Sequence, residues 1–110
     1  MNESILISIK KLLGLDRNYD AFDPDIIMHI NSVFMILNQL GVGPSECFKI
    51  EDDLSTWNDF INDNEKIEAV KSYMYHKVKM LFDPPISSAV MEANKQIIKE
   101  LEWRLNIQSE

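Results

Sequence analysis

The stretch FDPDIIMHINSVFMILNQLG, residues 22–41, decides the fold of this 110-residue chain. Asp23 is expected to cap a helix, and Pro24 suits the first helical position, where a missing N–H costs no hydrogen bond. Apolar residues then recur at helical spacing as one broad stripe, so this helix is predicted to be central to the core. The stripe consists of Ile26, Ile27, Ile30, Val33, Phe34, Leu37 and Leu40.

Three further helices are predicted around this one. The first covers residues 3–13, with Asn2 or Ser4 as its cap. The third covers residues 64–82, and its apolar face is Ile67, Val70, Met74, Val78 and Leu81. The fourth follows a cap at Ser87 or Ser88, and its stripe is Val90, Ile97, Ile98, Leu101 and Leu105. The prediction is all-α: a small four-helix bundle-like protomer, with one domain over residues 1–110.

Two consecutive prolines, Pro84 and Pro85, stop the third helix. The residue before a proline is pushed out of the helical region, and proline has no N–H with which to continue the hydrogen-bond ladder. A flexible loop would not need paired prolines. The corner is therefore predicted to fix the angle between the third and fourth helices.

An irregular stretch, residues 41–63, separates the second and third helices, with one short helical turn expected over residues 56–60. A long irregular stretch inside a compact domain is often functional. Trp57 and Phe60 either insert into a partner protein as anchors or fold back to cover the protein's own core. For Trp103 the same two roles, contact or core, are considered. The methionines expected in the core or at an interface are Met28, Met35, Met74, Met80 and Met91.

The charge of the chain is concentrated in this middle stretch. The net charge is −7, and residues 46–68 contribute −6, from eight acidic and two basic residues. Binding to nucleic-acid phosphates requires the opposite sign, so sequence-specific DNA binding is not expected. Cys47 is the one cysteine, which suits a reducing cytoplasm. No apolar run is long enough to predict a membrane span, and no signal peptide is expected.

Catalytic and metal-binding motifs are not recognised. His29 and His76 lie on different predicted helices, outside any two-histidine ligand motif. Asp25 and His29 are four residues apart and are interpreted as a surface pair on one helix. The acids of residues 51–53 do not follow a calcium-loop spacing. The protein is therefore predicted not to be an enzyme, with no cofactor and no metal.

The order of these features resembles the small phage head-tail connector proteins. The resemblance lies in FDPDIIMHINSVFMILNQLGVGP, the acidic WNDFI, AVKSYMYHKVKMLFDPP and the serine-capped helix ending in ELEWRLN. These proteins are also called head completion adaptors and are common in phages and prophages of Gram-positive bacteria. The resemblance covers nearly all of the chain.

This resemblance implies a structural virion protein without catalytic residues. Made in the cytoplasm of the bacterial host, it would assemble as a homo-oligomeric, dodecameric ring on the portal protein after DNA packaging. The ring would extend the channel for double-stranded DNA, without sequence-specific binding, and would carry the stopper or the tail completion protein. An all-helical protomer is implied, with no membrane partner.

Two hypotheses for the acidic stretch follow from the ring. It contacts the basic residues of a neighbouring copy, or it faces the channel and keeps DNA from adhering. The candidate residues for assembly or partner contacts are Asp52, Asp53, Trp57, Asp59, Phe60, Lys71, Lys77, Lys79, Pro84, Pro85 and Trp103.

Two other classes of function stay open. The chain is alternatively a small acidic helical module that inhibits a basic nucleic-acid-binding partner, which predicts a discrete complex and no ring. It is otherwise a small helical enzyme with an unrecognised carboxylate site, which predicts stabilisation by a metal and dependence on Asp25 or His29.

Overall fold

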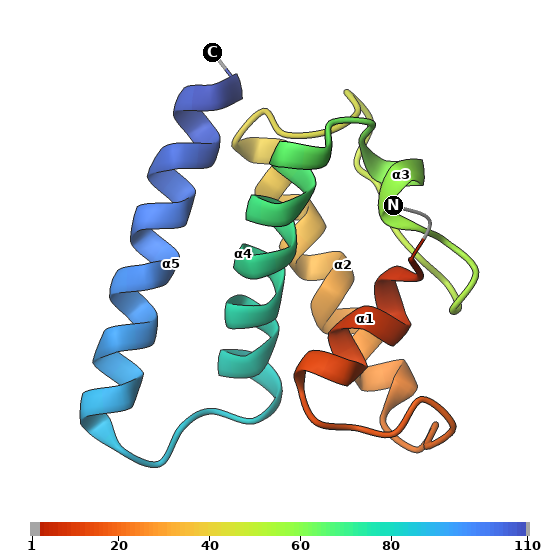
Figure 1. The fold of residues 1–110 in the computed structure, drawn as a ribbon, viewed down its shortest axis with the longest axis vertical. Helices are drawn as coiled ribbons and strands as arrows, with labels where there is room; N and C mark the ends of the chain where they lie inside the picture. Colours follow the sequence, from red (N-terminus) through yellow and green to blue (C-terminus); the bar gives the residue numbers. More distant parts are fainter. Residues whose placement is uncertain (1–2, 110) are drawn as a thin grey trace.

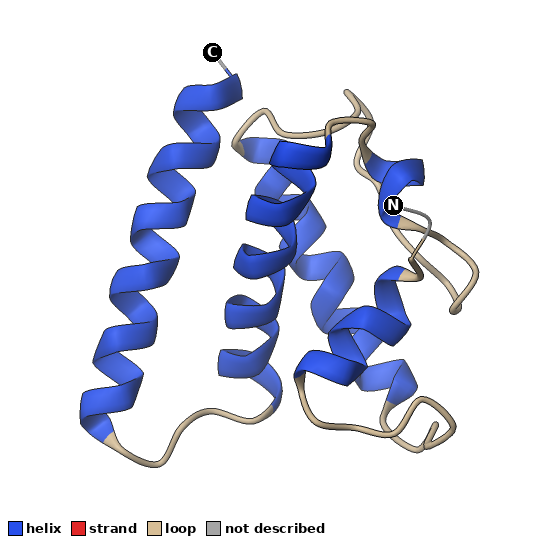
Figure 2. Cartoon of the chain, in the orientation of Figure 1, coloured by secondary structure: helices blue, strands red, loops and turns tan. Residues whose placement is uncertain are grey.

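A computed structural model describes residues 3–109 and confirms the all-α prediction (Figure 1). Its five helices, of which four are substantial, are α1 Ile5–Leu12, α2 Asp23–Gln39, α3 Trp57–Phe60, α4 Asn64–Phe82 and α5 Ser88–Ser109. Within the described residues there is no strand, only an isolated antiparallel bridge between Ser4 and Thr56. The loop before α3 runs from the end of α2 to the side of the molecule opposite α5 (Figure 2).

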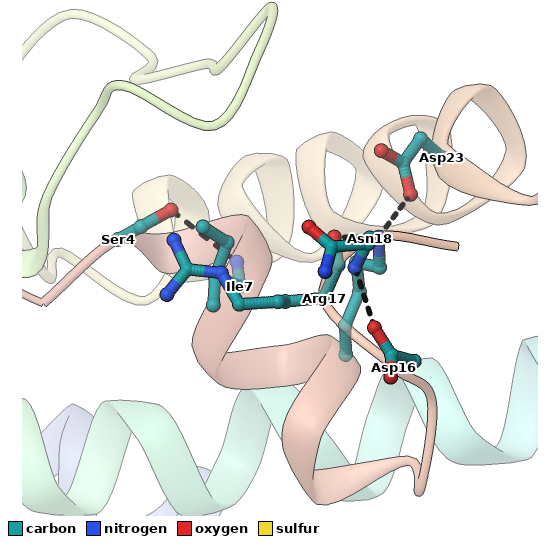
Figure 3. A network of polar contacts seen from close by, with 7 residues as sticks. Ser4, Ile7, Asp16, Arg17, Asn18 and Asp23 are labelled. Carbon is teal, nitrogen blue, oxygen red and sulfur yellow. Dashed lines mark hydrogen bonds and ion pairs between the residues drawn. The ribbon is translucent and has the colours of Figure 1, made fainter. Parts of the chain in front are cut away.

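The helix starts agree with the predicted caps except at α2. Ser4 caps α1, because its Oγ accepts a hydrogen bond from the Ile7 N–H at 3.3 Å, and Asn2 lies outside the described residues. Phe22, not Asp23, is the N-cap residue of α2, so the prediction for Asp23 is wrong. The Asp23 carboxylate instead lies 2.8 Å from the Lys10 ammonium (Figure 3). An unpaired buried ammonium costs more stability than a missing side-chain cap, which is why the Asp23 carboxylate pairs with Lys10.

Lys10 joins three segments at the end of α1. Its residue is only 1% exposed, and its ammonium also donates a hydrogen bond to the Arg17 carbonyl at 3.1 Å. Asp23 brings the start of α2 to the same ammonium. The link between α1 and α2, residues 13–22, is thereby held to both helices by one side chain.

The core lies where α1, α2 and α4 meet. The α2 stripe supplies Ile26, Ile30, Val33, Phe34 and Leu37, and α4 supplies Ile67, Val70, Tyr73, Met74 and Val78. α1 covers both helices with Ile5, Leu6 and Ile9. Met74 is buried as expected, whereas Met28 and Met35 are 58% and 59% exposed on the outer side of α2. Of the two roles predicted for these methionines, the core role is excluded within the protomer, and the interface role stays a prediction.

α4 and α5 form an antiparallel hairpin at one edge of the molecule (Figure 1). α4 ends at Phe82 as predicted, and Ser87 begins α5 by accepting a hydrogen bond from the Val90 N–H at 3.4 Å. Ile98 and Leu105 of α5 are buried where this helix packs against α4. The exposed apolar residues on this hairpin that were predicted to face the core are Leu81, Val90 and Ile97. Since α5 packs chiefly on α4, only a narrow stripe of it is covered.

Candidate assembly surfaces

The irregular stretch between α2 and α3 is fixed onto α2. The Asn31 side chain bonds the Ile50 backbone twice: its Nδ2 donates to the carbonyl at 2.9 Å, and its Oδ1 accepts from the N–H at 2.8 Å. Phe48 stacks edge-on against Phe34 and Phe60, with ring centroids 5.1 and 5.4 Å away. The acidic stretch is therefore held in a defined place on the protein.

Gly43 permits this packing. Its φ is +90°, in the left-handed region where a side chain is strained. A Cβ atom at this position would also collide with the ring of Phe60. The glycine lets the chain after α2 turn tightly over the aromatic cluster.

A projecting loop, residues 51–54, precedes α3 and ends in an exposed leucine. Leu54 is 77% exposed, and the acids beside it are Glu51, Asp52 and Asp53. The Asp52 carboxylate accepts a hydrogen bond from the Leu54 N–H at 2.9 Å, which closes an Asx turn. Ser55, just behind the loop, accepts a hydrogen bond from the Ile5 N–H at 3.0 Å. The loop is thus supported at its tip and at its base.

Trp57 follows the loop and points inward. It is fully buried, and its indole N–H donates to the Ser8 hydroxyl at 2.9 Å. Phe60 is buried as well. Of the two roles considered for these residues, the structure favours the flap over the protein's own core, because neither side chain is open to a partner in this arrangement.

Asp59 has a local role in α3. Its carboxylate accepts a hydrogen bond from the Thr56 N–H at 2.8 Å and completes a capping box with that residue. Asp52 likewise closes the turn at Leu54. In the projecting loop, Glu51 and Asp53 are exposed and form no ion pair with another described residue. These two acids are the ones free to meet a charge on another protein.

The three candidate lysines of α4 also differ in whether their charge is paired within the protomer. Lys71 lies 2.6 Å from the Glu3 carboxylate, and Lys79 lies 3.0 Å from the Asp83 carboxylate. Lys77 makes no ion pair with residues 3–109. Lys77 is therefore the candidate lysine whose charge is available without breaking an internal pair.

A groove of about 370 Å³ lies between α4 and α5, beside Lys77. Its lining residues are Lys77, Met80, Leu81, Glu92, Lys95, Gln96, Ile98, Lys99 and Glu102. Three lysines and two glutamates therefore border an apolar floor, which makes the groove slightly basic in a protein whose net charge is −7. Both helices contribute, so the groove exists only because the hairpin is closed.

Tyr73 and Glu102 fasten the two helices together behind this groove. The tyrosine hydroxyl donates to the Glu102 carboxylate at 2.7 Å. Burial, followed by the hydrogen bond and charge of Glu102, raises the pKa of Tyr73 well above its usual range, so the hydroxyl keeps its proton. Asn106 adds a longer bond to the Leu40 carbonyl, at 3.4 Å.

Tyr73→Phe is expected to loosen α5 without unfolding the rest of the protein. Losing one hydrogen bond to a partly exposed carboxylate costs about 1 kcal/mol. Amide hydrogen exchange should become faster in α5 and stay unchanged in α2. Tyr75→Phe, on the same helix, is the control and should leave α5 protected. Equal exchange in both variants would show that the Tyr73 bond does not hold the hairpin.

The outer side of α5 and the proline corner are open to solvent. Trp103 is 65% exposed, so the contact role is available to it and the core role predicted as its alternative is wrong. Pro84 is exposed and Pro85 half-buried, in the five-residue connection 83–87. These residues and the groove belong to the same hairpin.

The histidines form no ligand site. Within residues 3–109, no group of three or more His, Cys, Asp or Glu side chains is arranged to hold a metal ion. Asp25 is exposed and His29 half-buried on α2, as a surface or semi-buried helix pair requires, and no ion pair joins them in that part of the chain. His76 lies half-buried beside Tyr75, with ring centroids 5.1 Å apart.

His76 is expected to make the fold sensitive to mild acid. Burial lowers the pKa of His76 below its ordinary value of 6.5, because the folded state disfavours the charged ring. The unfolded chain binds the proton more tightly, so this contribution is complete above pH 6.5 and is lost as the pH falls below it. His76→Gln should flatten the fall in unfolding free energy between about pH 7 and about pH 5 in urea titrations. An unchanged slope would refute this.

These surfaces define a small all-α protein whose exposed features suit contacts with other proteins. The family model described as Phage connector protein matches residues 5–110, so the chain belongs to the phage connector protein family. That family is structural, and membership implies a connecting role between phage head and tail. No curated protein and no solved structure matches the chain. None of the described helices is both long and apolar enough to cross a membrane.

Sequence reasoning missed the parts of the surface that are made by two segments. Leu54, Lys95 and Lys99 were not singled out, although Leu54 directly follows a run of three acids and was a visible signal. The two lysines gave no such signal, because their position beside Lys77 depends on how α5 packs on α4.

Proposed function

We propose that this protein is the ring-forming adaptor between the portal and the tail of a phage or prophage of Gram-positive bacteria. The observation that carries the proposal is the family match over residues 5–110. The described geometry supports it. The molecule is flat, 35 × 34 × 20 Å, and places an acidic loop and a lysine-lined groove on different elements. Such a protomer suits side-by-side assembly through two unlike surfaces.

The proposed ring is dodecameric and sits on the portal after DNA is packaged. The whole chain acts as one connector domain, made in the host cytoplasm and retained in the virion. Its ring extends the channel and receives the stopper or the tail completion protein. Double-stranded DNA passes without sequence-specific binding, because the net charge of −7 repels its phosphates.

Co-sedimentation with portal rings from the same phage genome tests this function. Portal rings mixed with an excess of the protein should sediment faster than portals alone and carry the protein with them. An unrelated acidic helical protein of similar size is the control. Failure to co-sediment would refute the adaptor role and favour the acidic inhibitor of a basic partner.

The proline corner gives a prediction about assembly. Pro84→Ala with Pro85→Ala should leave a folded protomer, because neither ring is in the buried core. It should weaken portal binding, because the angle between α4 and α5 would no longer be restricted. Circular dichroism checks the fold and co-sedimentation checks the assembly. Normal portal binding by this double variant would contradict the role given to the corner.

A further inference from the structure

We infer that the projecting loop, residues 51–54, of one copy docks into the α4–α5 groove of the next copy, with Leu54 inserted between the two helices. This contact rests on the proposed function, since it is the joint from which the ring would be built. The hypothesis from the sequence was that the acidic stretch contacts the α4 lysines of a neighbouring copy. The present contact differs from it, because Lys71 and Lys79 are already paired within the protomer.

The loop and the groove have complementary apolar surfaces. Leu54 is 77% exposed, although the Asx turn at Asp52 holds it in place. An ordered, exposed leucine loses little conformational freedom when it binds. The groove offers Met80, Leu81 and Ile98 within about 370 Å³. Pockets that hold whole small ligands begin at roughly 300 Å³, so one leucine side chain has room.

The loop and the groove also carry complementary unpaired charges. Glu51 and Asp53 flank the leucine, and neither is paired within the described protomer. The groove has two carboxylates of its own. Both are already engaged within the protomer. The Glu102 carboxylate accepts a hydrogen bond from the Tyr73 hydroxyl, and the Glu92 carboxylate lies 3.6 Å from the Lys95 ammonium.

The remaining lysines of the groove, Lys77 and Lys99, form no ion pair with residues 3–109. Two unpaired acids on the loop therefore match two unpaired lysines on the groove. Opposite charges on two surfaces favour this pairing and disfavour a loop-to-loop contact.

The loop and the groove lie far apart within one protomer. The loop before α3 lies at one edge of the flat molecule, and the α4–α5 hairpin lies at the opposite edge (Figure 1). A protomer cannot fill its own groove with its own loop from there. Each copy would use its loop on one neighbour and its groove on the other, which is the head-to-tail contact that produces rings.

Disulfide trapping tests this contact. In a Cys47→Ser background, Leu54→Cys is combined with Leu81→Cys, and both positions are exposed. A disulfide forms only where the two Cα atoms come within roughly 7 Å. The protein is mixed with portal rings, oxidised mildly and separated by non-reducing electrophoresis. The matched control pairs Leu54→Cys with Leu12→Cys, which is also an exposed leucine but lies on α1.

We expect a ladder of covalent multimers from the Leu54–Leu81 pair and monomers from the control pair. Co-sedimentation with portals but no ladder would overturn the loop contact, leave the adaptor role standing and favour the channel-facing role for the acids. A ladder without co-sedimentation would support the contact and overturn the adaptor role. Neither a ladder nor co-sedimentation would overturn both.

Discussion

Replacing Trp57 with alanine is expected to remove about 3–5 kcal/mol of stability. The side chain is fully buried, and its indole N–H donates to the Ser8 hydroxyl of α1. The variant leaves a cavity beneath α3, and the Ser8 hydroxyl loses the hydrogen bond it accepts from the indole while keeping the one it donates to the Ile5 carbonyl at 3.0 Å. Because domains of this kind have only about 5–15 kcal/mol in total, a large fraction of the molecules should unfold at low urea concentrations. Urea titration followed by circular dichroism measures the change.

Trp103→Ala is the matched control for this prediction. Trp103 is 65% exposed on α5, so its removal should change the unfolding free energy by no more than about 0.5 kcal/mol. Comparable losses in the two variants would mean that Trp57 is not the core residue described here.

Asp23→Ala is expected to destabilise the fold by about 3 kcal/mol, because it leaves the buried Lys10 ammonium without its carboxylate. Asp25→Ala is the control. It lies in the same first turn of α2 but is exposed, so only its interaction with the helix dipole is lost, about 0.3–1 kcal/mol. Both changes are measured by urea titration.

A double variant separates charge from packing at this site. Lys10→Met together with Asp23→Asn removes both charges and keeps similar side-chain volumes. It should recover most of the stability lost by Asp23→Ala, since uncompensated burial of the charge is the main cost. If Asp23→Ala costs no more than Asp25→Ala, the ion pair is not what joins α1 to α2.

The helices could be predicted because their signals are local. α4 begins after the Asp63 cap and ends before Pro84, and both bounds agree with the prediction, residues 64–82. The short turn of α3 was also expected from residues 56–60. Propensity, capping and proline act within a few residues, so one sequence is enough to show them.

Burial was predicted less well, because it depends on neighbours that are distant in sequence. Val90 and Ile97 fit a helical stripe, yet they are exposed because α5 lies at the edge of the molecule. Lys10 falls on the buried side of α1, but its partner lies thirteen residues further along the chain. No local pattern indicates that Asp23 would serve Lys10 rather than cap its own helix.

The regions of the candidate surface were predicted from the sequence, but several of the residues exposed on it were not. The acidic stretch and the proline corner were visible from charge and composition. Trp57 and Asp59 turned out to support α3, whereas Leu54 projects. The basic side of the proposed contact is assembled from α4 and α5 together, and its lysines could be grouped only once the helices were placed.

Negative-stain electron microscopy of portal rings mixed with the purified protein is the direct test of ring assembly on the portal. An added ring layer is expected at one end of the portal and none at the other. Portals that stay unchanged at protein concentrations well above micromolar would contradict this assembly.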